Sequence, residues 1–388
     1  MNNRYRDIQN TRLNIDTEDW RIKDFSNPKG LIRLGTTFSG IGAIEYALKR
    51  LGLNYKISFA GDIDADCKAS YFANYDIRED QWHSDVHDFD ASVYQDKIDL
   101  LVGGAPCQAF SMRGKRGGFD DTRGTLFREF ARVVMECKPK VFIFENVRGM
   151  LNHDKGRTWN TILETFERDC NYQVYYQILN GKDYGIPQSR SRLFCIGFLN
   201  ETEFKFPCPI SLGAISMYDF LEKEFNKKYL LKHKGVHFVT EQVNRDKSYT
   251  QINGEVMLCQ KRNQQFNWHG DFVFHPLLIS DKSTPNSDPT VFDSTFGETD
   301  YYTETPLEKY PIVINGDICK MTTSSEINRH RGRFRKLTPS ECLKLMGFVD
   351  GFNIVVSDTA IYKQSGNSII VDVLIALLKQ MDITKYSI

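Results

Sequence analysis

Cys107 is the residue of this chain whose surroundings best suit covalent chemistry. It lies in the stretch LLVGGAPCQAFSMRGKRGG (residues 100–118), where a short apolar strand runs into two glycines and then into Pro106-Cys107-Gln108. A strand that ends in this way places the cysteine at the carboxyl edge of a sheet, where open α/β sheets bind their ligands. Cations in the segment that follows favour the thiolate, which is the attacking form of a cysteine. The pattern predicts a nucleophile followed by a flexible basic loop that closes over an anionic partner.

Seven of the other eight cysteines are interpreted as small buried hydrophobic residues. These are Cys67, Cys137, Cys170, Cys195, Cys259, Cys319 and Cys342. The chain has no Cys-x-x-Cys pair and no cysteine beside a histidine at ligand spacing, so we expect neither a metal site nor a disulfide framework. Reduced thiols indicate a cytosol-like compartment.

Charge and hydropathy limit the class of protein. Lys+Arg and Asp+Glu both number 50, which argues against coating nucleic acid by bulk charge but allows a local basic groove. The first residues lack the apolar core of a signal peptide, and no run approaches about 18 uninterrupted apolar residues. The longest candidate, residues 369–378, contains Asp372. We expect a soluble cytoplasmic protein without a membrane segment.

Two glycines and one acidic residue indicate a nucleoside site. Gly40 and Gly42 lie in FSGIG, directly after the first predicted strand, where glycines let a ligand approach the backbone. A tight turn without a ligand explains these glycines equally well. Asp62 ends the second predicted strand, about 20 positions later, where nucleoside-binding folds hold ribose hydroxyls. The third glycine of the dinucleotide pattern is missing, which favours a nucleoside with little or no phosphate over NAD or ATP.

Polar residues also follow two later predicted strands. Glu145 comes after four apolar residues and is either a cap of the next helix or a partly buried acid that stays protonated and donates a hydrogen bond. Alternation along QSRSR places Gln188, Arg190 and Arg192 on one side of the chain, which favours a site over a solvated edge. The basic run at residues 329–336 is interpreted as a phosphate-contacting segment rather than a solvated face.

The elements that position these residues alternate between strand and helix. Strands are predicted at residues 31–38, 57–62, 98–102, 141–145, 173–179 and 193–198. Helices are predicted up to about residue 51 and at residues 65–75, 125–137 and 159–168. This alternation predicts an α/β fold with a mostly parallel sheet and helices on both faces.

We divide the chain into four parts. Residues 1–30 are a polar N-terminal extension, and residues 31–206 form the α/β domain. The pattern changes near Phe206, and residues 207–334 are too many for a structureless loop, so we expect a smaller, mainly irregular or β domain there. Residues 335–388 return to α/β character, with a helical period at 338–346 and a final apolar stretch at 367–380.

The motifs together resemble those of the DNA cytosine-5 methyltransferases, especially the single-chain bacterial enzymes of restriction–modification systems. They follow the family order: FSGIG at 38–42, GGAPCQAFS at 103–111, ENVRGM at 145–150, QSRSR at 188–192, RKLTPSECLKLMGF at 335–348 and YKQSGNS at 362–368. The ordered set covers nearly all of residues 33–380 and is far more specific than any one motif. The resemblance implies a Rossmann-like methyltransferase sheet and a target-recognition domain at residues 207–334.

The resemblance also implies a reaction. A methyl group passes from S-adenosylmethionine to carbon 5 of a cytosine that is flipped out of duplex DNA. By match to the motifs, Cys107 is the nucleophile that attacks carbon 6, and Glu145 holds ring nitrogen 3 and the exocyclic amine. Arg192 stabilises the carbonyl oxygen, and Arg190 supports the same site.

The same match gives the cofactor contacts. They are Phe38, which packs on the adenine, Gly40 and Gly42 at the close approach, Asp62 on the ribose, Asp85 on the adenine amine, and Leu126 and Asn367 at the remaining contacts. The chain departs from the family at Thr36-Thr37, where Asp-Leu is usual, and at Asp62-Ile63, where Glu and an aromatic residue are usual. Both departures concern cofactor affinity rather than the type of reaction.

We expect a monomer whose partner is double-stranded DNA and which acts beside a cognate restriction endonuclease. A tRNA cytosine-5 methyltransferase is an alternative, although the Cys-Phe-Thr tripeptide typical of that branch does not occur. A catalytically silent DNA-binding regulator is disfavoured because Cys107, Glu145, Arg190 and Arg192 are all retained. A nucleotide-binding oxidoreductase is disfavoured by the missing third glycine.

Overall fold

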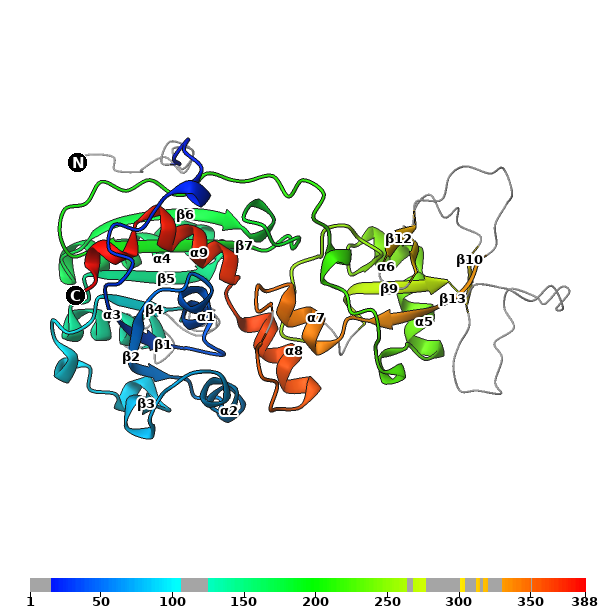
Figure 1. Ribbon diagram of the computed structural model, residues 1–388, viewed down its shortest axis with the longest axis horizontal. Helices are drawn as coiled ribbons and strands as arrows, with labels where there is room; N and C mark the ends of the chain where they lie inside the picture. The colour runs from blue at the N-terminus through cyan, green and yellow to red at the C-terminus, as the bar shows by residue number, and fades with distance from the viewer. Residues whose placement is uncertain are drawn as a thin grey trace, which may run out of the picture.

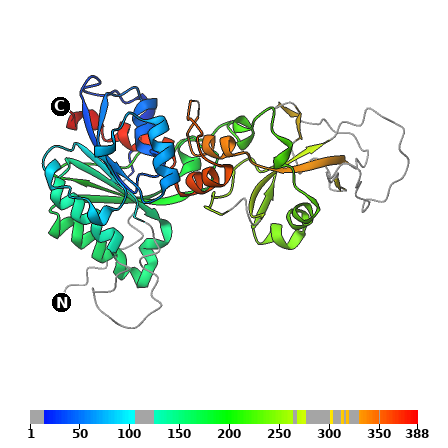
Figure 2. The same cartoon turned by 90° about the horizontal axis from the view of Figure 1, so that it is seen from below.

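The computed structural model describes residues 15–105, 125–263, 268–276, 301–303, 312–314, 317–319, 330–349 and 351–388. Cys107 and the loop that follows it lie outside the described residues. The described chain forms two lobes, one built on a seven-stranded sheet and the other on a four-stranded sheet (Figure 1 and Figure 2).

The larger sheet has the strand order β3-β2-β1-β4-β5-β7-β6. Its strands are β1 (Ile32–Thr37), β2 (Tyr55–Gly61), β3 (Trp82–His83), β4 (Leu100–Gly103), β5 (Val141–Val147), β6 (Gln173–Asn180) and β7 (Ser191–Phe198). The first five strands run parallel, whereas β7 runs antiparallel to both of its neighbours. All of β4 is buried, as expected of a central strand covered on both faces. The predicted mostly parallel α/β sheet is confirmed.

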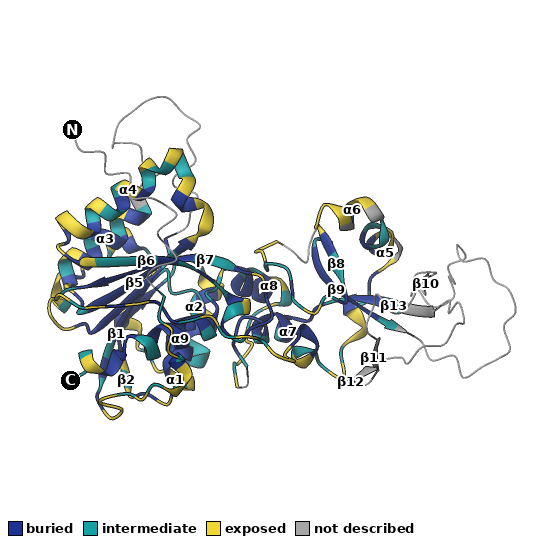
Figure 3. Cartoon of the chain, turned by 90° about the horizontal axis from the view of Figure 1, so that it is seen from above, coloured by how far each residue is buried: buried dark blue, intermediate teal, exposed yellow. Residues whose placement is uncertain are grey.

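Helices cover both faces of this sheet and enclose two apolar cores (Figure 3). One face carries α1 (Ala43–Arg50), α2 (Ala65–Asn74) and α9 (Val371–Gln380). The other carries α3 (Thr125–Cys137) and α4 (Arg157–Glu164). Helix α9 reads VDVLIALLKQ, which is apolar on nearly every side, and it is accordingly buried against α1.

The structure changes three details of the sequence-based assignment. Strand β3 was not predicted, because two residues are too few to show a period. The helix predicted at 159–168 is an α-helix only to the end of α4 and continues as a π-helical turn at Thr165–Asp169. The final apolar stretch holds the last residue of α8 (Asp358–Asn367) and all of α9, separated by extended backbone at Ser368 and Ile370.

By length and composition alone, Asp358–Gln380 could cross a membrane. This stretch is α8 followed by α9, and 72% of its most apolar window is buried inside the protein. Packing in the core of the larger lobe accounts for its apolar character.

The smaller lobe contains both strands and helices. Its four-stranded sheet has the order β10-β13-β9-β8, with β8 (Thr250–Ile252), β9 (Gly270–Pro276), β10 (Tyr301–Thr303) and β13 (His330–Lys336). A two-stranded ribbon joins β11 (Ile312–Ile314) to β12 (Asp317–Cys319). The helices α5 (His233–Thr240) and α6 (Gln242–Asp246) were not predicted. Between the lobes lie α7 (Pro339–Lys344) and α8 (Figure 1).

The described part of the N-terminal extension packs on the larger lobe. Ile15 forms a β-bridge with Phe206, and the Trp20 side chain is buried in the core that contains α9. Lys379 donates from Nζ to the carbonyl oxygen of Arg21 (2.7 Å). Through these contacts the described part of the extension packs along one side of α9.

The basic run at residues 329–336 enters the interior at Arg335. This side chain is fully buried, and its Nη1 and Nη2 lie 2.7 and 2.8 Å from the two carboxylate oxygens of Glu341. Its Nε donates to His275 Nε2 (2.9 Å). The prediction that this run contacts phosphate is wrong for Arg335, because its donors are already used to join β13 to α7.

Candidate active site

The predicted site residues converge on one edge of the larger sheet. Phe38 follows β1, Asp62 follows β2, Gly104 follows β4, and Glu145 lies near the end of β5. Because these strands are parallel, they end at the same edge, and the strand order reverses beside β1. That reversal is the position where open α/β sheets bind ligands.

In the turn between β1 and α1, the two predicted close-approach glycines have different surroundings. Both need a positive φ, which is +55° at Gly40 and +76° at Gly42. A Cβ at Gly42 would overlap the ring of Tyr75, whose hydroxyl donates to the Gly42 carbonyl oxygen (2.7 Å). A Cβ at Gly40 would meet no heavy atom of the described residues within 4 Å. Gly42 is therefore needed for packing, whereas Gly40 borders open space.

Asp62 is hydrogen-bonded to this turn. Its Oδ2 accepts from the backbone N–H of Gly40 (3.0 Å), and its Oδ1 accepts from that of Asp64 (2.9 Å). Burial raises the pKa of Asp62, and these two hydrogen bonds oppose the rise. Ile63, directly after it, is a large apolar side chain that is 80% exposed. An apolar surface and a carboxylate thus lie side by side at the end of β2.

The three remaining cofactor candidates lie on separate elements. Asp85 follows β3 and caps a short 3-10 helix by accepting from the N–H of His87 (3.0 Å). Leu126, in the first turn of α3, is partly buried in the same apolar core as Phe38. Asn367 is the exposed last residue of α8. The described residues show no direct contact among these three side chains.

Glu145 is a partly buried carboxylate rather than a helix cap. Its side chain is 13% exposed, and its Oε1 lies 3.2 Å from Nε of Arg192 on the neighbouring strand β7. A Cβ at Gly104 would lie only 3.1 Å from Oε2, so the chain leading to Cys107 departs beside this carboxylate. Burial raises the pKa of Glu145, and the nearby positive charges of Arg192 and Arg190 oppose the rise. Of the two interpretations left open by the sequence, the structure supports the partly buried acid.

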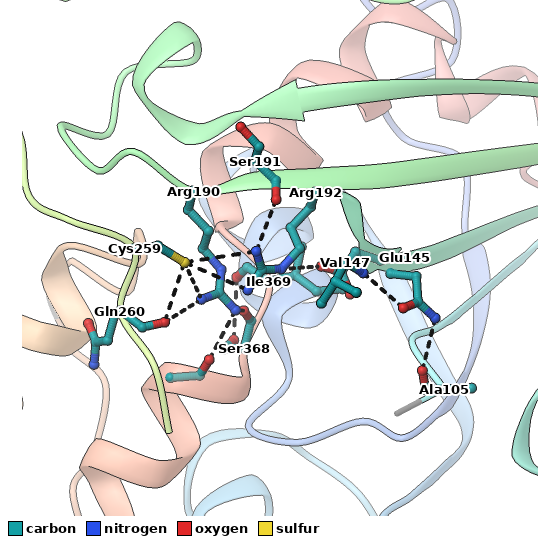
Figure 4. Close-up of polar contacts among 12 residues, drawn as sticks. Ala105, Glu145, Val147, Arg190, Ser191, Arg192, Cys259, Gln260, Ser368 and Ile369 are labelled. Atoms are coloured by element: carbon teal, nitrogen blue, oxygen red, sulfur yellow. Dashed lines mark hydrogen bonds and ion pairs between the residues drawn. The ribbon is translucent and has the colours of Figure 1, made fainter. Parts of the chain in front are cut away.

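Arg192 lies between Glu145 and a residue that the sequence analysis placed in the core. Its Nη1 and Nη2 are each 3.9 Å from Sγ of Cys259, which the smaller lobe supplies (Figure 4). Cys259 is only partly buried. No sequence signal marked it, because it lies in an irregular segment far from the arginines along the chain.

Arg190 donates hydrogen bonds to the backbone of two other segments. It is 3% exposed, and Nη1 donates to the carbonyl oxygen of Gln260 (2.7 Å). Its Nη2 donates to the carbonyl oxygens of Gly366 (3.0 Å) and Ser368 (2.7 Å). Burial lowers the pKa of Arg190 to about 10, so it remains charged near neutrality. It therefore lies near Arg192 and Glu145 but donates its hydrogen bonds to the protein backbone (Figure 4).

A short segment of the smaller lobe, Met257–Gln260, docks beside these arginines. The backbone of Met257 pairs with Pro187 and Ser189 through two hydrogen bonds of 2.8 Å. The N–H of Gln260 donates to Oε1 of Gln188 (3.1 Å). We call Met257–Gln260 the docking segment. Its backbone bonds explain why Gln188, predicted as a site residue, is fully buried.

Comparison with known proteins identifies the family. The family described as C-5 cytosine-specific DNA methylase matches residues 32–382. This chain belongs to that family. The type II methyltransferase M1.ScrFI of Lactococcus lactis subsp. cremoris is 33% identical over 370 residues, which are 93% of this chain and 80% of that protein. The type II methyltransferase M.SsoII of Shigella sonnei is 33% identical over 361 residues, covering 92% and 81% of the two chains.

The fold of this DNA cytosine-5 methyltransferase also matches solved structures. The Entamoeba histolytica methyltransferase EhMeth superposes with a TM-score of 0.64 and 17% identity, covering 91% of this chain and 98% of that one. At that identity the likeness shows the fold alone. The family and the enzyme class predicted from the sequence are both confirmed.

Proposed function

We propose that this DNA cytosine-5 methyltransferase modifies one cytosine within a short duplex sequence and thereby protects host DNA from a cognate restriction endonuclease. The observation that carries the chemistry is the partly buried Glu145–Arg192 pair, which lies where the chain departs toward Cys107. The type II names of M1.ScrFI and M.SsoII support the protective role.

The turn after β1 and the end of β2 suit S-adenosylmethionine. The space beside Gly40 is open among the described residues, and the Asp62 carboxylate can accept hydrogen bonds from ribose hydroxyls. Phe38 and Ile63 offer apolar surface for the adenine, with Asp85, Leu126 and Asn367 at the remaining contacts. We assign these residues to cofactor binding. When bound there, the cofactor supplies an electrophilic methyl group to carbon 5 of the cytosine.

Cytosine is too weak a nucleophile at carbon 5 to take that methyl group unaided. We assign the activating role to the Cys107 thiolate, which forms an S–C bond at carbon 6 while the carbon 5–carbon 6 π pair moves toward carbon 5. When a base later removes the proton from carbon 5, the C–H electron pair restores the carbon 5–carbon 6 double bond, and the S–C bond breaks with its electron pair returning to sulfur. Cys107 is thus regenerated, and the base ring recovers its aromaticity.

Glu145 and Arg192 act on the opposite edge of the base in this proposal. In its acid form, which burial favours, Glu145 donates a hydrogen bond to ring nitrogen 3, where negative charge develops as the thiolate adds. Arg192 is held by Glu145 on one side and Cys259 on the other, and its guanidinium stabilises the carbonyl oxygen. Arg190 supports the site by bracing the surrounding backbone.

We assign DNA reading to residues 207–334, whose described part forms the smaller lobe. Residues 31–206 and 335–388 form the catalytic part, because the described part of each contributes elements to the larger lobe or to its junction. A base flipped from the duplex would reach Glu145 beside the docking segment. The contacts of Cys259 with Arg192 and of Gln260 with Gln188 support this assignment.

The proposal is tested by transfer of labelled methyl groups from S-adenosylmethionine to mixed-sequence duplex DNA, duplex RNA and tRNA, followed by base-resolved mapping. We expect 5-methylcytosine in duplex DNA within one short motif. Cys107→Ser should abolish transfer, because a serine hydroxyl is not ionised near neutral pH and adds to carbon 6 far more slowly.

Label on tRNA alone would move the enzyme to the RNA-modifying branch. Absence of label on every substrate, with cofactor still bound, would support a silent regulator. Transfer that persists in Cys107→Ser would remove Cys107 from the mechanism.

A further inference from the structure

A buried carboxylate lies behind the proposed cofactor turn, away from the base-binding residues. Glu45, in the first turn of α1, is 1% exposed. Its Oε1 accepts hydrogen bonds from Oη of Tyr71 (2.6 Å) and from Oγ1 of Thr36 (3.2 Å). Burying a carboxylate is costly, so its presence in the core calls for a role that an apolar residue could not fill.

A row of hydrogen bonds links Glu45 to the turn. Oγ1 of Thr36 lies 2.7 Å from Oγ of Ser39, which accepts from the N–H of Gly61 (2.9 Å). Because Ser39 accepts from Gly61, its own hydrogen is available to Thr36, and the Thr36 hydrogen is available to Glu45. Every hydroxyl in the row can then direct its hydrogen toward the carboxylate. We call these four residues the Glu45 row: Glu45, Thr36, Ser39 and Gly61.

The Glu45 row joins two turns that the sheet itself does not join. The backbone register between β1 and β2 ends at Gly35 and Phe59. Beyond that point, Ser39 donates its N–H to the Gly61 carbonyl oxygen (2.9 Å), and Gly40 donates to Asp62 (3.0 Å). The row therefore stabilises the close approach of the two segments that carry the proposed adenine and ribose contacts.

We propose that Glu45 is a positioning residue for the cofactor, acting through Thr36 and Ser39 to hold the β1–α1 turn against Asp62. This inference rests on the cofactor site assigned above. It also accounts for one departure from the family pattern. Thr36 stands where Asp is usual, and α1 supplies a carboxylate to the same place through Glu45.

The electrostatic surroundings make this positioning sensitive to pH. The groups that face Glu45 are Tyr71 from α2, Tyr75 directly after α2 and Tyr55 from β2, and burial raises the pKa of all three, so they stay neutral. Burial also raises the pKa of Glu45 from 4.5 to about 7. A hydrogen bond to an ionised acceptor is stronger than one to a neutral acceptor. The hydrogen bonds of the Glu45 row therefore become stronger as Glu45 ionises.

The test measures binding of S-adenosylhomocysteine to the full-length protein by calorimetry between pH 6 and 8.5, with thermal unfolding recorded for each variant. Thr36→Val removes the hydroxyl and keeps the branched shape, whereas Thr36→Ser keeps the hydroxyl. We expect Thr36→Val to raise the Kd about five- to tenfold, the usual worth of one hydrogen bond, and Thr36→Ser to stay within about twofold. Affinity of the unmodified protein should rise with pH, and Glu45→Gln should remove that rise.

A second readout does not require any ligand. Hydrogen exchange of the free protein should be faster in the peptides that contain Ser39 and Gly61 in Thr36→Val than in Thr36→Ser. Equal exchange and equal Kd in both variants would overturn the positioning role. An unchanged pH dependence in Glu45→Gln would overturn it as well. Failure of the unmodified protein to bind S-adenosylhomocysteine would instead overturn the proposed cofactor site, and with it this inference.

Discussion

Burial determines what each charged side chain of this methyltransferase can do. Glu145 and Glu45 are both shielded from water, and the pKa of both carboxyls is raised for that reason. Glu145 lies near two arginines at the sheet edge, whereas Glu45 accepts hydrogen bonds from two hydroxyl groups in the core. The same residue type therefore serves as a proposed acid at one position and as a proposed anchor at the other.

Glu145→Gln should lower kcat about 100-fold or more, because an amide cannot deliver a proton to ring nitrogen 3. The measurement is single-turnover methyl transfer on DNA that contains the mapped target. Glu164→Gln, which changes an exposed carboxylate on α4, is the matched control and should act like the unmodified enzyme. If Glu145→Gln retained full activity, the acid would have to be another group.

Glu45 should make the folded state less stable as pH rises from about 4.5 to about 7. In that interval the unfolded chain has released the Glu45 proton and the folded chain still holds it, so raising the pH favours unfolding. The loss is about 3 kcal/mol for a shift of this size. The free energy of unfolding in urea should fall between pH 5 and pH 7.5, and this fall should be smaller in Glu45→Gln by most of that loss, about 2 kcal/mol. An equal pH difference in both proteins would contradict the assignment.

At the level of elements, the turn between β1 and α1 uses two glycines for different reasons. Both adopt a left-handed backbone, but only Gly42 is packed against another side chain, Tyr75. Gly40 borders the open space assigned to the cofactor. The two glycines form a matched pair for experiments, because the same substitution should have different effects at each.

Gly42→Ala should lower the free energy of unfolding by about 3 kcal/mol, since it combines backbone strain with overlap of the Tyr75 ring. Gly40→Ala carries the strain alone, about 1 kcal/mol, but its methyl group enters the cofactor space and should weaken S-adenosylhomocysteine binding. Chemical denaturation and calorimetry measure the two effects. Unchanged binding in Gly40→Ala would move the cofactor away from this turn.

At the scale of the whole molecule, the two lobes meet at buried polar contacts. Arg190 holds the docking segment through Gln260 and the start of the α8–α9 break through Gly366 and Ser368. A Cβ at Gly366 would overlap the backbone of Lys261 and Arg262, so the two segments are in close contact. The exposed residue between these bonds is Asn367, a proposed cofactor contact. The residues proposed for DNA reading, base chemistry and cofactor binding thus meet at one junction.

Arg190→Lys should lower both stability and activity. A single ammonium group cannot reach three carbonyl oxygens as the guanidinium fork does, so we expect a loss of about 1 to 3 kcal/mol in unfolding free energy. Displacement of the junction should lower kcat about tenfold or more. Arg168→Lys, at an exposed position, is the control. Normal kcat in a destabilised Arg190→Lys would limit this residue to a structural role.

Local patterns along the chain were sufficient to predict the larger sheet, its flanking helices and the family. The strand-to-helix alternation and the ordered motifs depend on residues that are close in sequence, such as FSGIG and the apolar run before Glu145. The helix at Thr125–Cys137 was predicted with its observed bounds. Short elements such as β3, and the helices of the smaller lobe, have periods too weak to detect without their tertiary contacts.

Only the tertiary structure showed which partners the predicted site residues contact. Glu145 is paired with Arg192, Arg190 bonds to backbone, and Cys259 joins them from the other lobe, although these residues are far apart in sequence. Arg335 looked like a surface cation and is a buried partner of Glu341. The physical reason is the same in each case. A residue's type determines the bonds it can form, but the packing of distant segments determines its burial and its partners.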